Sequence, residues 1–404
     1  SGWIADRLGA RRVFVGAMGL FLTGSLTCGA APSMEILILG RLVQGLGGAL
    51  MTPVGRLVML RTVPRAELVS AMAWLTIPAL IGPVVGPPLG GMLTTWASWR
   101  WIFWINLPIG LIGMVAALAV LPEVREDRRP PFDGLGFALS TVGLTAAVFA
   151  FETVGRDIVP LAVDALVALF GLVTLALYVR HARTAEHPLI DLRLLRKPAF
   201  SAAIWGGSLF RIGVGALPFL LPLQLQLGFG RSALQSGLTT FVAAIGAIGM
   251  KVAAKRVLTR FGFRATLTAD AVIAGAFLAA IGFVTDTTPL AVVMGILLVG
   301  GFFRSLEFTA INVVAYSDIT AEEMSRATAF SSMMQQLSLS AGVALGALTL
   351  HVLEARSPGP LSSTDFSIAL TLVGSVSMAA ALVFARLPRG AGADLLKAEP
   401  RAAD

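Results

Sequence analysis

The chain has 404 residues, of which 56% are hydrophobic and only 13% are charged, and its mean hydropathy is +0.82. Soluble domains carry about 25% charged residues, so this chain has too little polar surface to cover a soluble globule of its size. The single cysteine, Cys28, excludes a disulfide framework, and the three histidines argue against a histidine-based metal site. These values predict an integral membrane protein without a metal site.

About twelve hydrophobic stretches are long enough to cross a bilayer, which takes roughly 20 helical residues each. They are rich in Leu, Ala, Val and Gly and show no alternation of apolar and polar residues, so they predict helices rather than barrel strands. The fold class is therefore predicted to be all-α. The predicted spans are residues 13–31, 36–60, 68–95, 100–121, 134–152, 158–179, 199–223, 233–254, 265–284, 289–316, 325–353 and 366–385.

The loop before the first predicted span, GWIADRLGARR, is basic but also contains an aspartate and two glycines. A basic loop ordinarily only anchors that side of a membrane protein in the cytoplasm. A carboxylate beside a basic group or at a helix N-terminus can also hold two helices together and release them when the helices move. The candidate latch residues are Gly2, Asp6, Arg7, Gly9 and Arg11.

Arg41 lies inside the second predicted span, where an unpaired charge costs a few kcal/mol, so it is a candidate functional residue. Gln44, Gly48 and Thr52 follow on about the same helix face and form a polar, small-residue stripe. A guanidinium stays charged and changes the proton affinity of a nearby carboxylate when helices move. The alternative is a static pair that only fixes helix packing.

The third predicted span, WLTIPALIGPVVGPPLGGMLT, is apolar but full of residues that weaken a helix. Gly82, Gly86 and Gly90 share one helix face because they recur at helical spacing. Pro83 and Pro87 each remove a backbone donor and favour a kink. We expect a bent helix whose glycine face packs closely against a partner helix.

Asp164 in the sixth predicted span is a candidate proton-binding carboxylate. Because it lies near the outer end of that span, we expect it to be solvated. The connector at residues 180–198 is basic and partly amphipathic, so we expect it on the inner membrane surface.

The C-terminal half carries polar residues within its predicted spans, which predicts a water-accessible polar cavity. Arg304 and Glu307 are close enough on one helix to form a local pair. Glu307 then either binds a cationic substrate or a proton, or is neutralised permanently by Arg304. The candidate cavity residues are Arg211, Arg304, Glu307, Asn312, Gln335 and Gln336.

The basic residues lie mostly on one side of the predicted membrane. About 22 of the 31 Lys and Arg residues occupy one set of alternating loops, and about four occupy the opposite set. This bias predicts that both chain ends are cytoplasmic. It also explains the net charge of +8 without a nucleic-acid partner.

Two short segments, RLGAR at 7–11 and RFGFR at 260–264, echo each other, and each precedes a predicted span. The echo suggests duplicated halves. Two spans precede the second copy within its half and none precedes the first, so we expect that this chain lacks its first two helices. The expected domains are 1–122, an N-terminal bundle; 123–198, a linker with an extra helix pair; 199–388, a C-terminal bundle; and 389–404, a cytoplasmic tail.

Several of these segments resemble the major facilitator superfamily, and in particular its fourteen-helix branch of drug:proton antiporters (EmrB/QacA-like). Residues 2–14 are similar to the signature loop between helices two and three, and the sequence around Arg41 resembles the fourth-helix motif. Segments 99–110, 132–136, 187–200 and 301–312 also fit this branch. The antiporter motif G-x-x-x-G-P-x-x-G-G is filled at every fixed position, by Gly82, Gly86, Pro87, Gly90 and Gly91.

The resemblance implies two pseudo-symmetric helix bundles with an extra helix pair between them, in a bacterial inner membrane. It implies a role in proton coupling for Arg41 and Gln44, and it links the glycine motif to exchange rather than uptake. The family's carboxylate partner of this arginine lies on the first helix, which is one of the two helices expected to be missing. The sequence therefore names no carboxylate for Arg41.

We therefore predict a proton-coupled multidrug efflux transporter that works by alternating access on small hydrophobic or cationic substrates. No zinc-protease, serine-hydrolase or phosphate-loop motif is present, so we expect neither an enzyme nor a cofactor. The expected partners are substrates, protons, the lipid bilayer and, as one option, a periplasmic adaptor. The alternatives are a dedicated exporter of one endogenous metabolite and a non-transporting membrane sensor or scaffold.

Overall fold

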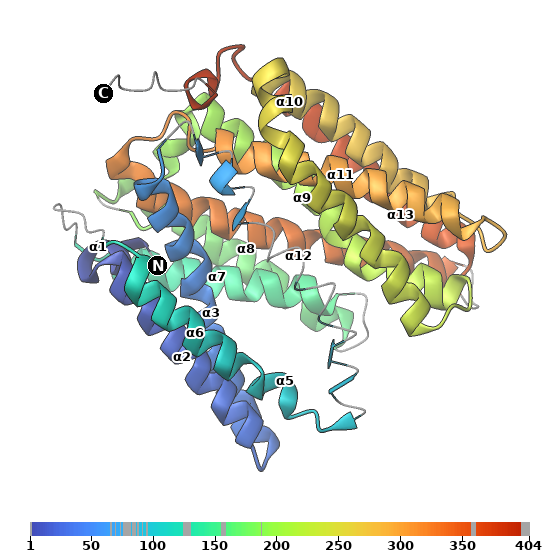
Figure 1. The fold of residues 1–404 in the computed structure, drawn as a ribbon, viewed down its shortest axis with the longest axis horizontal. Helices are drawn as coiled ribbons and strands as arrows, with labels where there is room; N and C mark the ends of the chain where they lie inside the picture. Colours follow the sequence, from blue (N-terminus) through green and yellow to red (C-terminus); the bar gives the residue numbers. More distant parts are fainter. Residues whose placement is uncertain are drawn as a thin grey trace. The chain divides into compact units, whose positions relative to one another are not determined.

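The computed structural model of the chain is built from helices (Figure 1). It describes residues 2–64, 67–68, 70–72, 74–75, 82, 86, 89–90, 92–93, 96–123, 131–154, 159–186, 188–356 and 361–396. None of these residues lies in a β-strand, which confirms the predicted fold class. Ten helices in this part of the chain are long and apolar enough to cross a membrane.

The helices follow the predicted spans along the chain. The α-helices are α1 (Gly2–Leu8), α2 (Ala10–Ala30), α3 (Met34–Thr62), α5 (Trp101–Trp104), α6 (Asn106–Val120), α7 (Gly134–Thr153), α8 (Leu161–Thr184), α9 (Pro198–Leu223), α10 (Ala233–Gly282), α11 (Leu290–Val314), α12 (Met324–Arg356) and α13 (Ser363–Phe384). Short helical turns lie at Leu192–Arg196, Gln224–Gly228, Ala321–Glu323 and Ala393–Leu395.

Two predicted spans, 233–254 and 265–284, lie in the single long helix α10, which has 50 residues. The backbone of Gly262 interrupts the helical geometry with φ 75° and ψ 166°, so α10 is two spans joined at a kink. A positive φ of this size is accessible to glycine without steric cost. Most of the predicted span 68–95 lies outside the described residues.

The ends of several helices follow from local capping chemistry. Ser232 accepts a hydrogen bond from the Gln235 amide and completes a capping box at the start of α10. Ser362 and Asp365 form the same motif at the start of α13. Pro222 near the end of α9 removes a backbone donor, and a π-helical turn follows directly at Gln224–Gly228.

The described chain divides into two compact units. The first contains Ser1–Pro64, Val85–Phe132 and Thr320–Ser332, and the second contains Arg65–Val84, Asp133–Ile319 and Met333–Asp404. The domain boundaries expected from the sequence follow chain order rather than these units, and they stay predictions.

Helices α2 and α3 of the first unit approach each other closely at glycines. A Cβ on Gly24 would overlap the backbone of Gln44, and a Cβ on Gly47 would overlap the backbone of Phe21. Small residues allow such contact where lipid tails provide no hydrophobic drive for helix association. The close approach brings polar side chains of the two helices within hydrogen-bonding distance.

The second unit contains a helix hairpin, α7 with α8, and a bundle in which α10 packs against α11 and α13 (Figure 1). In the hairpin, a Cβ on Gly171 of α8 would lie 3.1 Å from the backbone carbonyl oxygen of Gly143 on α7. A Cβ on Gly301 of α11 would overlap the backbone of Ala243 of α10. The largest fully buried side chains of this unit are Phe200, Phe210, Phe263, Phe366 and Phe384.

The two echoed segments share a local structure. Gly9 separates α1 from α2 with φ 94°, and Gly262 separates the two parts of α10 with φ 75°. Both glycines therefore allow a sharp turn between two helices that a residue with a side chain would strain.

Candidate functional site

A polar network in the first unit connects three helices around Arg41. The Nη1 atom of Arg41 donates to Oε1 of Gln44 at 3.1 Å, and Nε2 of Gln44 donates to Oγ of Ser25 on α2 at 2.6 Å. The Nδ2 atom of Asn106 on α6 donates to the same Ser25 oxygen at 3.1 Å. The structure thus places the two predicted proton-coupling residues, Arg41 and Gln44, in one network.

An aromatic ring also holds the Arg41 guanidinium. Its Cζ atom lies 4.5 Å from the centroid of the Phe103 ring. A cation over a ring face is stabilised by the ring quadrupole, most strongly where water is scarce. Arg41 itself is exposed in the chain, whereas Gln44 and Ser25 are buried. The guanidinium is therefore held by Gln44 and Phe103, although Arg41 as a residue is exposed.

Sequence reasoning missed two members of this network. Ser25 is one of many small residues in its span, and nothing in the local pattern distinguishes it. Asn106 carried a signal, because it is an amide within the apolar run WRWIFWINLPIG. Glycine contacts between α2 and α3, at Gly24 against Gln44 and at Gly40 against Cys28, bring these helices together.

The structure places Asp6 of the predicted latch in an ion pair with Arg61 on α3. Oδ1 of Asp6 and Nη1 of Arg61 are 2.8 Å apart, and the side chains are 17% and 8% exposed, respectively. Both residues belong to the first unit. The sequence indicated a helix N-terminus or a basic residue as the partner of Asp6, but it did not identify Arg61, which lies at the end of the second span.

The other predicted latch residues lie around this pair. Gly2 is the first residue of α1, and Gly9 forms the turn between α1 and α2. Arg7 lies over the Trp3 ring at 5.3 Å, and Arg11 is in the first turn of α2. The latch residues are thus close along the chain, in α1, in the turn at Gly9 and in the first turn of α2.

The predicted antiporter motif is only partly described. Gly82, Gly86 and Gly90 have helical backbone, whereas Pro87 and Gly91 lie outside the described residues. A Cβ placed on any of these three glycines meets no described atom within 4 Å. The close helix contact that we expected at this motif stays a prediction.

The predicted cavity residues of the C-terminal half are brought together only in part. Nη2 of Arg211 on α9 donates to Oδ1 of Asn312 on α11 at 3.2 Å, and its guanidinium lies 5.8 Å from the Phe308 ring centroid. Gln335 and Gln336 lie on α12, where Gln335 is half-buried and Gln336 is exposed. No hydrogen bond among the described residues joins either glutamine to the Arg211–Asn312 pair.

Glu307 has a different neighbour from the one that we predicted. It is fully buried on α11, and its two carboxyl oxygens accept no hydrogen bond from the described residues. The local ion pair with Arg304 does not form there. Instead, Glu307 faces the carboxyl group of Asp270 on α10. Sequence reasoning missed Asp270, although it is the single carboxylate in the apolar span 265–284.

Asp164 corrects another expectation. It is 3% exposed, and Oγ1 of Thr153 donates to its Oδ1 at 2.6 Å. The prediction of a solvated Asp164 is wrong, because α7 and α8 pack as a hairpin and bring Thr153 over the carboxylate. A residue near the end of a span is thus buried when a neighbouring helix end covers it.

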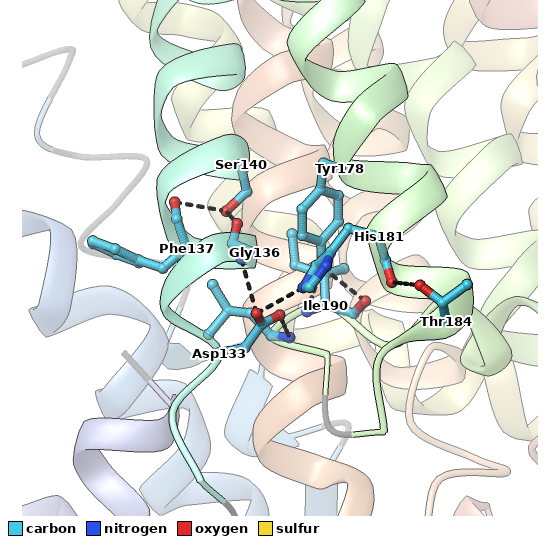
Figure 2. Close-up of polar contacts among 9 residues, drawn as sticks. Asp133, Gly136, Phe137, Ser140, Tyr178, His181, Thr184 and Ile190 are labelled. Atoms are coloured by element: carbon cyan, nitrogen blue, oxygen red, sulfur yellow. Dashed lines mark hydrogen bonds and ion pairs between the residues drawn. The ribbon is translucent and has the colours of Figure 1, made fainter.

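Asp133 connects the start of α7 with the end of α8 and the following segment (Figure 2). Its Oδ1 accepts from the Gly136 amide at 2.8 Å and lies 2.8 Å from Nε2 of His181, and its Oδ2 accepts from the Leu189 amide at 3.1 Å. Burial raises the pKa of Asp133, but these hydrogen bonds and the attraction of His181 outweigh it and hold the pKa below its usual value.

Tyr178 fastens the same segment to α8 (Figure 2). Its hydroxyl donates to the Ile190 carbonyl at 3.0 Å and accepts from the Ile190 amide at 2.8 Å. Two segments that resemble the antiporter branch, 132–136 and 187–200, are therefore in direct contact around Asp133. These contacts hold the connector between α8 and α9 against the helix pair.

Comparison with known proteins identifies the family. The family model described as Major Facilitator Superfamily matches residues 1–343. The chain belongs to the Major Facilitator Superfamily. It is therefore a multi-pass membrane transporter, and its apolar helices are membrane spans rather than the core of an enzyme.

Two similar proteins come from bacteria. The chain is 38% identical over 395 residues to "Putative multidrug resistance protein MdtD" of Escherichia coli O157:H7, with 96% of this chain and 83% of that protein covered. The protein of the same name in Escherichia fergusonii is 38% identical with the same coverage. These relatives are consistent with a bacterial inner membrane.

A solved structure shows the same fold. The crystal structure of the human organic anion transporter MFSD10 (TETRAN) has a TM-score of 0.67 and 16% sequence identity, and the match covers 95% of this chain and 79% of that chain. The expected fourteen-helix branch and the expected absence of the first two helices stay predictions.

Proposed function

We propose that this transporter exports small hydrophobic and cationic compounds in exchange for protons, by alternating access. The identity of 38% to proteins named for multidrug resistance supports the substrate class. Membership in the superfamily supports secondary transport over a sensor or scaffold. In alternating access, the substrate site opens to one side of the membrane at a time.

The observation that carries the proposal is the Arg41 network. A guanidinium cannot lose its charge under physiological conditions, so its field acts on every nearby titratable group. Gln44, Ser25 and Asn106 connect this charge to three helices. When one helix moves against another, this permanent charge moves within an apolar bundle. The movement changes the proton affinity of the titratable groups near the charge.

The Asp6–Arg61 pair supports a second part of the mechanism. Its two charged groups lie 2.8 Å apart and are largely shielded from solvent. A charge-assisted hydrogen bond of this kind is strong enough to hold a helix turn in place, yet it exchanges with other partners when the helices move. We assign it the role of a cytoplasmic latch, with Gly2, Arg7, Gly9 and Arg11 around it.

The test is proton release from everted membrane vesicles that contain the protein. Respiration acidifies the vesicle interior, and a fluorescent pH probe is quenched. We expect several unrelated lipophilic cations to restore fluorescence, because each cation that enters the vesicle releases protons. Arg41→Ala should abolish this response, whereas Arg231→Ala, which removes an exposed loop arginine, should leave it intact.

The other outcomes distinguish the alternative functions. A response to one compound alone would favour a dedicated exporter of a single metabolite. If correctly inserted protein gives no recovery of fluorescence with any of the compounds, proton exchange is contradicted and a sensor or scaffold is favoured. A response that persists in strains without periplasmic adaptor proteins would show that the transporter acts alone.

A further inference from the structure

The Arg41 network contains a permanent charge but no carboxylate among its described members. Proton exchange needs a group that binds and releases the proton within the membrane. Arginine, glutamine, serine and asparagine cannot serve, because none of them titrates near neutral pH. The proton-binding group of the proposed exchange is therefore not one of these four residues.

Two buried carboxyl groups of the second unit meet this requirement. Asp270 on α10 is 2% exposed, and Glu307 on α11 is 0% exposed. They face each other between these two helices. A Cβ on Gly300 of α11 would lie 3.1 Å from the side chain of Phe277, which is on the same arm of α10 as Asp270, so this arm and α11 are in contact one to two turns from the pair.

None of the four carboxyl oxygens accepts a hydrogen bond from the described residues. Two ionised carboxylates only accept, so neither can satisfy the other. When one of them is protonated, its O–H donates to its neighbour, and the mutual repulsion disappears. Buried acceptors without donors are costly, so the pair is stable with one shared proton.

Three helices, α9, α10 and α11, carry the positive groups to be considered beside the pair. Arg211 on α9 is close enough to attract Glu307, while it also donates to Asn312 at 3.2 Å. Lys251 on α10 donates to Oγ1 of Thr309 at 2.7 Å, and Arg304 lies on α11 one turn from Glu307. The neighbouring α13 has one charged residue, Asp365, at its N-terminus.

We propose that Asp270 and Glu307 form the proton-binding site of this transporter and that a cationic substrate competes with the shared proton there. With one proton, the pair carries one negative charge, which Arg211 balances. Without the proton, a second negative charge remains, and a monovalent organic cation balances it. Either the proton or the cation is bound, but not both, which is the condition for exchange.

This proposal rests on the proposed function, because it identifies the group that holds the exchanged proton. The alternative is a static carboxyl hydrogen bond that only packs α10 against α11. The two roles differ in one observable property. An exchange site loses its proton when a cation binds, whereas a packing contact keeps it.

The experiment measures proton release from purified protein in detergent at low buffer concentration, on addition of tetraphenylphosphonium. The wild type should release about one proton for each cation bound, because one shared proton is displaced. Asp270→Asn and Glu307→Gln should each abolish the release. Asp164→Asn is the matched control, because it removes another buried carboxylate, on α8, outside the pair.

A second measurement needs no variant. Dicyclohexylcarbodiimide modifies protonated carboxyl groups in apolar surroundings, and mass spectrometry locates the modified residue. We expect modification of Asp270 or Glu307 in the wild type, and we expect tetraphenylphosphonium to suppress it. This result is independent of whether the variants fold.

The failures of the two proposals are distinguishable. Equal proton release from the wild type and both variants, with no protected label on Asp270 or Glu307, would overturn the pair as the proton site and leave proton exchange intact. A wild type that does not bind the cation, or binds it without releasing a proton, would overturn the exchange itself. Proton release that is lost only in Asp164→Asn would move the site to α8.

Discussion

Asp6 and Arg61 lie at opposite ends of the first two membrane spans, yet their charged groups are 2.8 Å apart. The Gln44 amide likewise binds Ser25 on a different helix. In contrast, Arg41 and Gln44 are three residues apart, and helix geometry alone brings them together. Local pairs of side chains can therefore be predicted from spacing, whereas pairs between helices depend on packing.

Substitution of Asp6 by Asn should reduce transport by about fivefold, which corresponds to about 1 kcal/mol, because a charge-assisted hydrogen bond to Arg61 is lost. The initial rate of proton-driven export measures the effect, with the amount of inserted protein determined in parallel. The exchange of both residues, Asp6→Arg with Arg61→Asp, should restore part of the rate. Unchanged transport in Asp6→Asn would remove the latch role.

Asp133 should make the stability of the protein sensitive to acid. Its pKa is lowered from 3.8 in the folded state, so its hydrogen bonds stabilise the fold fully above pH 3.8. This contribution is lost as the pH falls through the lower pKa of the folded state. Thermal unfolding in detergent should therefore show a loss of stability at acid pH that is smaller in Asp133→Asn.

At neutral pH, the same variant should be less stable than the wild type by about 1 kcal/mol, because an amide cannot accept all the hydrogen bonds of the carboxylate. Asp286→Asn in an exposed loop serves as the control and should behave like the wild type at both pH values. Equal acid sensitivity of the wild type and Asp133→Asn would contradict the role of this carboxylate.

At the scale of helices, apolar length predicted where the spans lie, and glycine contacts decided how they pack. The long helix α10 joins two predicted spans at Gly262, where φ is 75°. Close contacts occur at Gly24, Gly47 and Gly301, whereas Gly295 of α11 faces open space. Sequence spacing alone does not distinguish the closely packed glycines from Gly295, because close packing depends on which helix lies opposite each glycine.

Gly301→Ala should destabilise the protein by about 1–3 kcal/mol, because the added methyl group overlaps the backbone of Ala243 and the helices must separate. Gly295→Ala on the same helix has room and should be neutral or slightly stabilising, since Ala favours helix over Gly. Thermal unfolding in detergent compares the two. Equal unfolding temperatures for both variants would contradict the packing argument.

At the scale of the whole molecule, the chain has the fold and family of a membrane transporter. The side of the membrane on which each loop lies is still a prediction from the basic residues. Cys28, which is buried, is the single cysteine of the chain. One substitution therefore gives a cysteine-free protein for labelling experiments.

In a Cys28→Ala background, Asp286→Cys should react with a membrane-impermeant maleimide in intact cells, because its loop is predicted to face outward. Arg389→Cys should react only after the membrane is made permeable, since both chain ends are predicted to be cytoplasmic. Both positions are exposed in the chain, so access to the reagent depends on membrane side. The reverse labelling pattern would contradict the predicted orientation.

The sequence by itself determined that this protein is helical and crosses a membrane, because apolar composition and span length are local properties that lipid requires of each segment. It also determined the family, through motifs that follow one another along the chain. Only the tertiary structure decided the partners Asp6–Arg61, Gln44–Ser25 and Asp270–Glu307. These contacts join different helices, and their geometry depends on how closely glycine lets the backbones approach.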